Sequence, residues 1–391
     1  MTPLLTYLFG RLPIGWLQLS HNRTRLLAAI AGVGFANLLV FVQLGIMGAL
    51  NASTTAAYAL FNADILVSSA DANTLTDGSN VARQRLFQAL GIPGVDDGTP
   101  LFIANLEWQR TDGTSSTLQT FGLGADATHF LMPEIGADFG HLVLEDTVLI
   151  DRSTRGLAGD ALEGVTPNTP FVFEARDRTL SAVGTLDVGG GFSADGKLFA
   201  SDQTFLRLFG TRSSGAPNHI LLKVEDGIDA AVVVDRLQAV LPADSVKINT
   251  LSDAAAADLS YQTTERPTGI IFGFGVLIGV LVGIVIVYQI LSTDVAEHLK
   301  EYATFKAMGY SQGFFLGIVF EEAIILAVLG FIPGLLASIG LYAGLAAATG
   351  LPLEMGADRA IAVLLGTLSA CSISGAIATR RLAGADPADL F

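Results

Sequence analysis

One glycine-rich stretch of this chain, GFSADGKL over residues 191–198, comes close to a motif with known chemistry. It nearly matches the phosphate-binding loop of nucleotide hydrolases, in which the Lys is followed by a Ser or Thr that binds Mg²⁺. Leu198 stands in that position, and a strand-like segment follows Lys197 where a phosphate loop requires a helix N-terminus. We therefore interpret the stretch as a turn between two strands, outside any nucleotide site.

The remaining residue types that support catalysis or metal binding show no recognisable spacing. The five histidines are His21, His129, His141, His219 and His298. None belongs to an HExxH sequence, and the chain has no GxSxG sequence. The single cysteine, Cys371, lies in an apolar run that favours an inert thiol and excludes a disulfide within the chain. The sequence thus predicts no catalytic, metal-binding or cofactor-binding residue here.

A short charged segment between two apolar runs has the pattern of an amphipathic helix, predicted to span Asp294–Met308. Asp294 can cap it, with Glu297 at the capping-box spacing, and Gly309 can end it in a left-handed conformation. An isolated helix of this length is marginally stable in water, so we expect it to pack on something. By pattern alone, an interfacial connector and a segment that docks into a partner's groove both stay open.

The two faces of this predicted helix differ in polarity. The apolar arc holds Val295, Leu299, Tyr302 and Ala303, the polar arc holds Glu297, His298, Lys300, Glu301 and Thr304, and Phe305 lies at the edge. Lys306 falls in the apolar arc and breaks the pattern unless its stem lies along the apolar surface.

Composition predicts a membrane protein with a large polar part. Of the 391 residues, 51% are hydrophobic and 15% are charged, against about 25% charged in a soluble domain. A spanning helix needs about 20 mostly apolar residues. The four runs that qualify are 26–50, 268–291, 313–348 with its lead-in, and 360–379. The first is too long for a cleaved signal peptide, so we expect a retained anchor.

The basic residues orient these spans. They are Arg11, Arg23 and Arg25 before the first span, Lys300 and Lys306 between the second and third, and Arg380 and Arg381 after the fourth. The positive-inside rule then places both termini and residues 292–312 in the cytoplasm, and residues 51–267 and 349–359 outside. Residues 1–25, interrupted by Pro13, are expected to form an interfacial helix, and residues 380–391 a cytoplasmic tail. We expect an inner-membrane protein with a periplasmic domain.

Residues 51–267 are expected to form that domain, an α+β fold. They carry 28 acidic and 14 basic residues, which argues against nucleic acid as a partner. Strand-like runs are Asp64–Ser69, Leu101–Leu106, Thr117–Leu123, Thr147–Ile150, Phe171–Glu174, Thr179–Asp187 and His219–Val224, and helix-like runs are Val81–Leu90 and Gly227–Leu241. In the last run Ile228, Val232, Leu237 and Leu241 should share one face.

Two features of the apolar runs bear on function. Glu321 and Glu322 come just before the core of the third span, where an ionisable residue is costly and often functional. A position within the span and one at the cytoplasmic interface are both open, and we favour the interface. Gly275, Gly279 and Gly283 repeat at a spacing that permits close helix packing, either in a dimer or on another span of the same chain.

Several runs of the chain together resemble a known permease family. They are PIGWLQLSHNRTRLL, GFSADGKLFASDQTFLRLF, VIVYQILSTDVAEHLKEYATFKAMGY, FEEAIILAVLGFIPG and SGAIATRRLAGADPADLF. This sequence resembles the FtsX/MacB family of ABC permeases, and within it the DevC-type permeases of DevBCA-like exporters. The family has one span, a large extracytoplasmic domain and three further spans. That is the plan expected here: an α-helical membrane protein with four transmembrane helices and a large α+β extracytoplasmic domain.

The resemblance implies a homodimeric, non-catalytic permease subunit that binds two copies of a separate cytoplasmic ABC ATPase, which holds the ATP and Mg²⁺. The coupling helix on that ATPase would use Val295, Glu297, His298, Leu299, Lys300, Glu301, Tyr302, Phe305, Lys306, Met308 and Gly309. The outside domain would contact a periplasmic membrane-fusion adaptor, which reaches a TolC-like outer-membrane channel. DevC-type exporters are associated with glycolipid as cargo, and the family is thought to pass ATPase motion across the membrane.

Three alternatives stay open. An FtsX-like regulator would switch a cell-wall hydrolase, and such permeases usually have a smaller outside domain. A lipoprotein-releasing permease would carry a bound lipoprotein. A membrane-anchored enzyme would have its active site in residues 51–267, although no catalytic motif indicates one.

Overall fold

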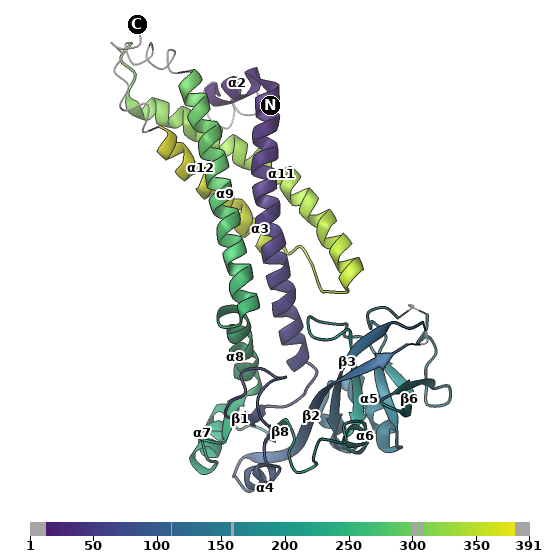
Figure 1. Cartoon of the computed structure of the whole chain (residues 1–391). Coiled ribbons are helices and arrows are strands. Elements are labelled where there is room, and N and C mark those ends of the chain that lie inside the picture. Colours follow the sequence, from purple (N-terminus) through teal and green to yellow (C-terminus); the bar gives the residue numbers. More distant parts are fainter. Residues whose placement is uncertain (1–12, 111, 158–159, 299–303, 305–307, 380–391) are drawn as a thin grey trace. The chain divides into compact units, whose positions relative to one another are not determined.

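The computed structural model describes residues 13–110, 112–157, 160–298, 304 and 308–379 of the chain (Figure 1). Two compact units make up the chain. A helical unit comprises Met1–Gly48, Pro267–Gly344 and Leu353–Phe391, and an α/β unit comprises Ala49–Arg266 and Leu345–Pro352.

Four long helices dominate the helical unit. They are α3 (Arg23–Tyr58), α9 (Pro267–Glu297), α11 (Gln312–Thr349) and α12 (Ala357–Ala378), and the short α2 (Ile14–His21) precedes them. In the part of the chain that the structure describes, these four helices are long and apolar enough to cross a membrane. The prediction of four spanning helices is therefore confirmed. The start of α2 directly after Pro13 is consistent with the expected interruption, since Pro lacks the N–H of a helix interior.

The predicted helix start at Asp294 is wrong. α9 continues without a break through Asp294 to Glu297. Leu291 and Val295, four residues apart, are both buried and extend the apolar face of α9. Packing of this apolar face therefore outweighs the capping-box spacing of Asp294 and Glu297, which had predicted a helix start at Asp294.

The other end of the predicted helix agrees with the structure. The Met308 N–H donates to the Thr304 carbonyl at 3.0 Å, and Gly309 has a φ of +94°, the left-handed conformation expected after a helix. Residues 299–303 and 305–307 lie outside the described residues. The predicted roles of Leu299, Lys300, Glu301, Tyr302, Phe305 and Lys306 therefore stay predictions.

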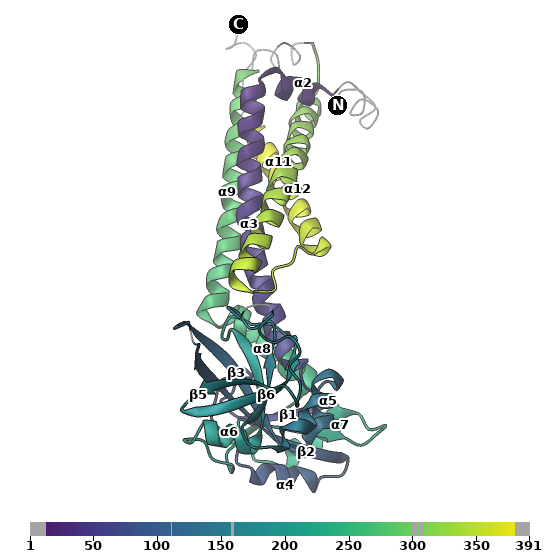
Figure 2. The ribbon, with the colours of Figure 1, turned by 90° about the vertical axis from the view of Figure 1, so that its right-hand side faces the viewer.

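Close packing of α9 on α3 explains the glycine repeat, and Figures 1 and 2 show the two helices side by side. A Cβ atom on Gly279 would lie 3.0 Å from Val40 Cγ2, and one on Gly283 would lie 3.3 Å from Ala36 Cβ. At Gly275 it would lie 2.5 Å from the Gln43 side chain. Of the two interpretations left open, the structure shows packing within the same chain.

The α/β unit contains a nine-stranded mixed sheet in the order β5-β6-β4-β7-β3-β2-β8-β1-β9. The strands are β1 (Ile65–Ser69), β2 (Val95–Gln109), β3 (Ser115–Leu123), β4 (Thr147–Asp151), β5 (Phe171–Ala175), β6 (Arg178–Leu186), β7 (Gly196–Ser201), β8 (His219–Val224) and β9 (Val246–Thr250). All seven strand-like runs of the sequence lie on these strands. The α+β expectation is confirmed.

One end of the sheet has a ferredoxin-like βαββαβ arrangement. Strands β9, β1, β8 and β2 are antiparallel neighbours in that order, and the helices of this half are α4 (Gln84–Leu90) and α7 (Ala230–Val240). The α7 face differs from the prediction at one position. Val232 is 43% exposed and Val233 is buried in its place, whereas Leu237 and Leu241 are buried as predicted.

The other half of the sheet is an insertion between β2 and β8. The 15-residue β2 belongs to both halves, since residues 95–101 pair with β8 and residues 102–109 pair with β3. The shorter elements of this insertion are η1 (Ala127–Phe130), α5 (Pro133–Phe139), η2 (Gly140–Val143) and α6 (Asp202–Leu208). After β9, α8 (Leu251–Thr264) leads toward α9.

Residues 191–195 of the glycine-rich stretch lie in the connection of β6 to β7, as the sequence predicted, and residues 196–198 begin β7. Lys197 is in β7, only 7% exposed, and its Nζ donates to the Gly189 carbonyl at 3.0 Å. Burial lowers the pKa of Lys197, while the nearby Asp151 carboxylate opposes that shift. The lysine therefore belongs to the packing of the sheet.

Candidate functional site

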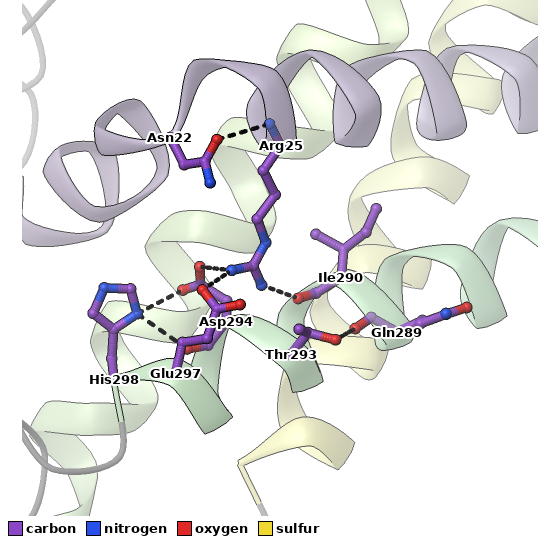
Figure 3. A network of polar contacts seen from close by, with 8 residues as sticks. All are labelled: Asn22, Arg25, Gln289, Ile290, Thr293, Asp294, Glu297 and His298. Carbon is purple, nitrogen blue, oxygen red and sulfur yellow. Dashed lines mark hydrogen bonds and ion pairs between the residues drawn. The ribbon is translucent and has the colours of Figure 1, made fainter.

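A cluster of polar side chains lies where α3 begins and α9 ends, and we call Arg25, Asp294, Glu297 and His298 the polar cluster (Figure 3). The position of Arg25 follows from the local start of α3. Asn22 accepts a hydrogen bond from the Arg25 N–H at 3.2 Å, which caps the first turn of that helix. Arg25 therefore lies in the first turn of α3, with its side chain extended toward α9.

The Arg25 guanidinium contacts three successive positions on one side of α9. Its Nη2 donates to the Ile290 carbonyl at 3.2 Å, and its Nη1 lies 3.5 Å from Asp294 Oδ1 and 2.5 Å from Glu297 Oε2. The Asp294 side chain is 4% exposed, whereas that of Glu297 is 59% exposed. Because removing one partner of a buried pair leaves the other charge unpaired, loss of Arg25 should cost more at Asp294 than at the exposed Glu297.

His298 extends the cluster to the last described residue before the segment 299–303. Its Nδ1 donates to the Asp294 carbonyl at 3.0 Å and lies 3.7 Å from Asp294 Oδ2. A cavity of about 170 Å³ adjoins the cluster and is also lined by Gln18, Leu19 and Leu26. The beginning of the predicted coupling segment is thus bonded to α3 through one buried carboxylate.

Glu321 and Glu322 lie beneath α2 and not on an exposed surface. The Trp16 N–H, in the first turn of α2, donates to Glu321 Oε1 at 3.4 Å. This contact supplies an acceptor that α2 lacks of its own, since Pro13 stands at its N-cap without a side-chain bond. Gly15 packs so closely that a Cβ atom there would lie 2.9 Å from Glu322 Cγ.

Glu322 is fully buried, and neither carboxyl oxygen has a hydrogen-bond partner among the described residues. Burying a carboxyl group without a partner is costly. The contacts of Trp16 with Glu321 and of Gly15 with Glu322 place the N-terminal end of α2 against α11. Whether this level lies at the membrane interface, as we expected, stays a prediction.

The structure separates the predicted coupling residues into different environments. Val295 is 1% exposed and belongs to the core formed with Leu291 and Phe315, so the prediction that its side chain docks on a partner is wrong. Glu297 and His298 belong to the polar cluster. Met308 is 60% exposed at the other end of the segment.

The α/β unit contains a second buried polar group, which the sequence did not indicate. Asp258 of α8 is 3% exposed, and its Oδ2 accepts from the Tyr58 hydroxyl and the Leu75 N–H, both at 2.9 Å. Gln262 Nε2 donates to its Oδ1 at 3.2 Å. Burial raises the pKa of Asp258, while these hydrogen bonds oppose the shift. One carboxyl group thus connects the end of α3 to α8.

The sequence did not indicate which residues Arg25 and Asp258 contact. Arg25 counted only as a basic residue that orients the first span, and Asp258 was one of many acidic residues in the domain. A local signal existed only for Asn37, one of two amides, with Gln43, within the uncharged run Leu26–Leu50. Long-range pairing has no local signature, so only the fold could identify the other two.

The sequence of residues 272–387 matches the family described as FtsX-like permease C-terminal. This region, which includes most of α9 together with α11 and α12, is therefore similar to the C-terminal part of FtsX-like permeases. Comparison of the whole sequence with curated proteins found no match.

Three solved structures are similar to part of the chain. The periplasmic region of MacB from Actinobacillus actinomycetemcomitans is 10% identical, with a TM-score of 0.35 over 53% of this chain and 96% of that one. The extracellular domain of the noncanonic ABC-type transporter YknZ from Gram-positive bacteria is 9% identical, with a TM-score of 0.32 over 46% and 91%. A domain of a permease protein from Porphyromonas gingivalis is 13% identical, with a TM-score of 0.29 over 48% and 86%.

Proposed function

We propose that this chain is the permease subunit of an ATP-driven tripartite exporter of the DevC type. It would work as a homodimer in the inner membrane, with two copies of a cytoplasmic ABC ATPase that bind the ATP and Mg²⁺. A periplasmic membrane-fusion adaptor would connect it to a TolC-like outer-membrane channel, and glycolipid is the cargo that we propose. The match of residues 272–387 to FtsX-like permeases supports the ABC-transporter part of this proposal.

The polar cluster is the observation that carries the proposed mechanism. Arg25 bonds the end of α9 to the first turn of α3, directly before the segment that would sit on the ATPase. A displacement of that segment would therefore move α9 and α3 together. Arg23 and Arg25 at this end support a cytoplasmic placement by the positive-inside rule.

The far end of α3 offers a route for the same motion. α3 is one helix from Arg23 to Tyr58, and the Tyr58 hydroxyl donates to Asp258 of α8, the helix that precedes α9 in the chain. At its far end α3 is thus bonded to α8, the helix that precedes α9 in the chain. ATP-driven motion would then change this periplasmic unit without cargo having to pass between the helices.

The proposal is tested by the double variant Tyr302→Asp/Phe305→Asp in proteoliposomes that contain the partner ATPase. We expect normal membrane insertion and loss of ATPase stimulation, because two apolar docking residues would become charged. A matched control is Phe87→Asp/Val143→Asp, which changes two exposed apolar residues of the α/β unit and should leave stimulation intact. Normal stimulation by the first variant would refute docking through this segment.

The exporter assignment is tested by the proteins that co-purify with the full chain from membranes. Recovery of an ATPase with an intact phosphate-binding loop together with a membrane-fusion adaptor is the expected result. A cell-wall hydrolase or a bound lipoprotein in place of the adaptor would contradict the exporter while leaving the ATPase coupling intact.

A further inference from the structure

Two acidic side chains on neighbouring helices lie together beside the polar cluster, and we call Asp294 and Glu322 the carboxyl pair. Asp294 belongs to α9 and Glu322 to α11, and these helices share one apolar core through Leu291, Val295 and Phe315. The Asp294 side chain is 4% exposed, and Glu322 is fully buried. The Glu322 carboxyl group lies within hydrogen-bonding reach of the Asp294 carboxyl group. The fold thus brings two acidic groups together away from solvent.

Most oxygens of the carboxyl pair lack a hydrogen-bond donor. Among the described residues, nothing donates to Asp294 Oδ2 or to either Oε atom of Glu322. An ionised carboxyl oxygen can only accept, so two ionised groups that face each other repel and leave these buried acceptors unsatisfied. A proton on one group turns its oxygen into a donor. A strong O–H···O⁻ bond to the other group then satisfies both.

The surrounding charges favour a proton at this position. The charged groups that act on Glu322 are Asp294, Glu321 and Arg25, and only Arg25 among these is a cation. Its guanidinium already contacts Asp294 Oδ1 and the exposed Glu297 (Figure 3). With one shared proton the carboxyl pair carries a single negative charge, which Arg25 balances. Without a proton, a second negative charge would be buried with no cation to balance it.

The other titratable groups packed around the pair do not supply the missing donor. α2 contributes His21, which lines the cavity beside the polar cluster, while α9 and α12 contribute Tyr288 and Cys371 to the shared core. His298 Nδ1 donates to the Asp294 main-chain carbonyl at 3.0 Å and lies 3.7 Å from Asp294 Oδ2, which is too far for a hydrogen bond. Among the described groups, the two acids are therefore each other's nearest polar partners at these oxygens.

We propose that the carboxyl pair is a proton-binding site, in which Asp294 and Glu322 share one proton at neutral pH and thereby join α9 to α11. Movement that parts the two helices and admits water would release the proton, because a solvated carboxyl group is ionised at neutral pH. The inference goes beyond the proposed function and does not rest on it, since the site needs neither an ATPase nor a cargo.

Infrared difference spectroscopy of the full chain in detergent at neutral pH tests for the bound proton. The wild type should show the C=O band of a protonated carboxyl group, which shifts in D₂O and is missing from Glu322→Gln. The amide N–H of this variant supplies a permanent donor to Asp294, so no proton is needed. Glu297→Gln is the matched control and should keep the band, because that side chain is 59% exposed and contacts the same arginine.

The pH dependence of stability gives a second readout. The folded state would hold one proton that the unfolded chain lacks above about pH 5, where free carboxyl groups are ionised. Stability should therefore fall as the pH rises, with the folding equilibrium constant decreasing about tenfold per pH unit while the proton stays bound. Glu322→Gln should lose this contribution. Unfolding is followed by Trp16 fluorescence in a Trp108→Phe background, since the Trp16 N–H donates to Glu321.

An unchanged protonated-carboxyl band in Glu322→Gln would overturn the proposal, as would equal pH slopes for this variant and the wild type. If Glu322→Gln does not fold, Asp294→Asn decides, because its amide also supplies a donor and should remove both signals. Loss of stability when Na⁺ and K⁺ are replaced by a large organic cation, without a protonated-carboxyl band, would mean that a metal ion occupies the site and that the proposal is wrong.

Failure of this proposal is distinguishable from failure of the proposed function. No ATPase is present in either measurement, so absence of the bound proton with normal ATPase stimulation refutes only the proton site. A bound proton in a chain that stimulates no ATPase refutes only the coupling.

Discussion

At the scale of single residues, one cation holds the polar cluster together. Arg25→Met should lower the free energy of unfolding by about 3 kcal/mol, because Asp294, with a side chain 4% exposed, would lose its partner. The measurement is denaturant unfolding of the detergent-solubilised protein. Arg23→Met, which changes an exposed arginine two residues away, should have little effect.

The double variant Arg25→Met/Asp294→Leu provides the stricter comparison. Replacing both charges with apolar groups should recover most of the lost stability, since the buried Asp294 carboxylate is removed together with its partner. If the double variant is as unstable as Arg25→Met, the charge pair is not the reason for the loss.

His219 makes the α/β unit sensitive to acid. It is 1% exposed, its Nε2 donates to the Leu75 carbonyl at 2.8 Å, and its Nδ1 accepts from the Ser68 hydroxyl at 2.9 Å. Burial lowers the pKa of His219 to about 4. Between pH 6.5 and pH 4 the unfolded state therefore binds more protons than the folded state, so stability falls as the pH falls through this range.

The expected loss from His219 is about 3 kcal/mol between pH 6.5 and pH 4. It is measured as the difference between wild type and His219→Gln in denaturant unfolding, followed by Trp108 fluorescence in a Trp16→Phe background. The variant should be less sensitive to pH, while His129→Gln, a change at an exposed site, should follow the wild type. If the free energy of unfolding falls equally with pH in wild type and His219→Gln, His219 is not the cause of the acid sensitivity.

At the scale of the elements, the glycine face of α9 sets its distance from α3. Gly279→Leu should destabilise the helical unit by about 1–3 kcal/mol, because its side chain would overlap Val40. Gly273→Leu on the same helix is the matched control, since a Cβ atom there has no neighbour within 4 Å. The measurements are thermal unfolding and the size of the protein after chemical cross-linking. A change in oligomeric state without loss of stability would show that the glycines serve a dimer.

At the scale of the whole molecule, Asp258 is the point where the ends of α3 and α8 are joined. Asp258→Ala would leave the Tyr58 hydroxyl and the Leu75 N–H without their acceptor. We expect this variant to stimulate the partner ATPase normally and to lose most export, because motion would no longer be shared by the two helices. Asp235→Ala, at an exposed position of α7, should behave as wild type. Full export by Asp258→Ala would exclude this route.

Much of the fold followed from local patterns, and the misses have physical causes. The alternation of apolar residues located the central part of β2, but its first residues, Val95–Pro100, contain two aspartates, a glycine and a proline, which are typical of a turn. β9 was missed because only Val246 and Ile248 are apolar in its five residues. In both strands, pairing with neighbouring strands outweighs weak local preference.

The sequence by itself determined four helices apolar enough to span a membrane, an α+β unit after the first of them, and the FtsX-like character of the C-terminal region. These properties are local, since apolar length and strand alternation depend on neighbouring residues. Only the tertiary structure decided that Arg25 meets Glu297, 272 positions away, and that Val295 is buried while Asn37 lines a groove. Such contacts depend on how helices pack, because residues distant in the chain become partners only when their faces meet.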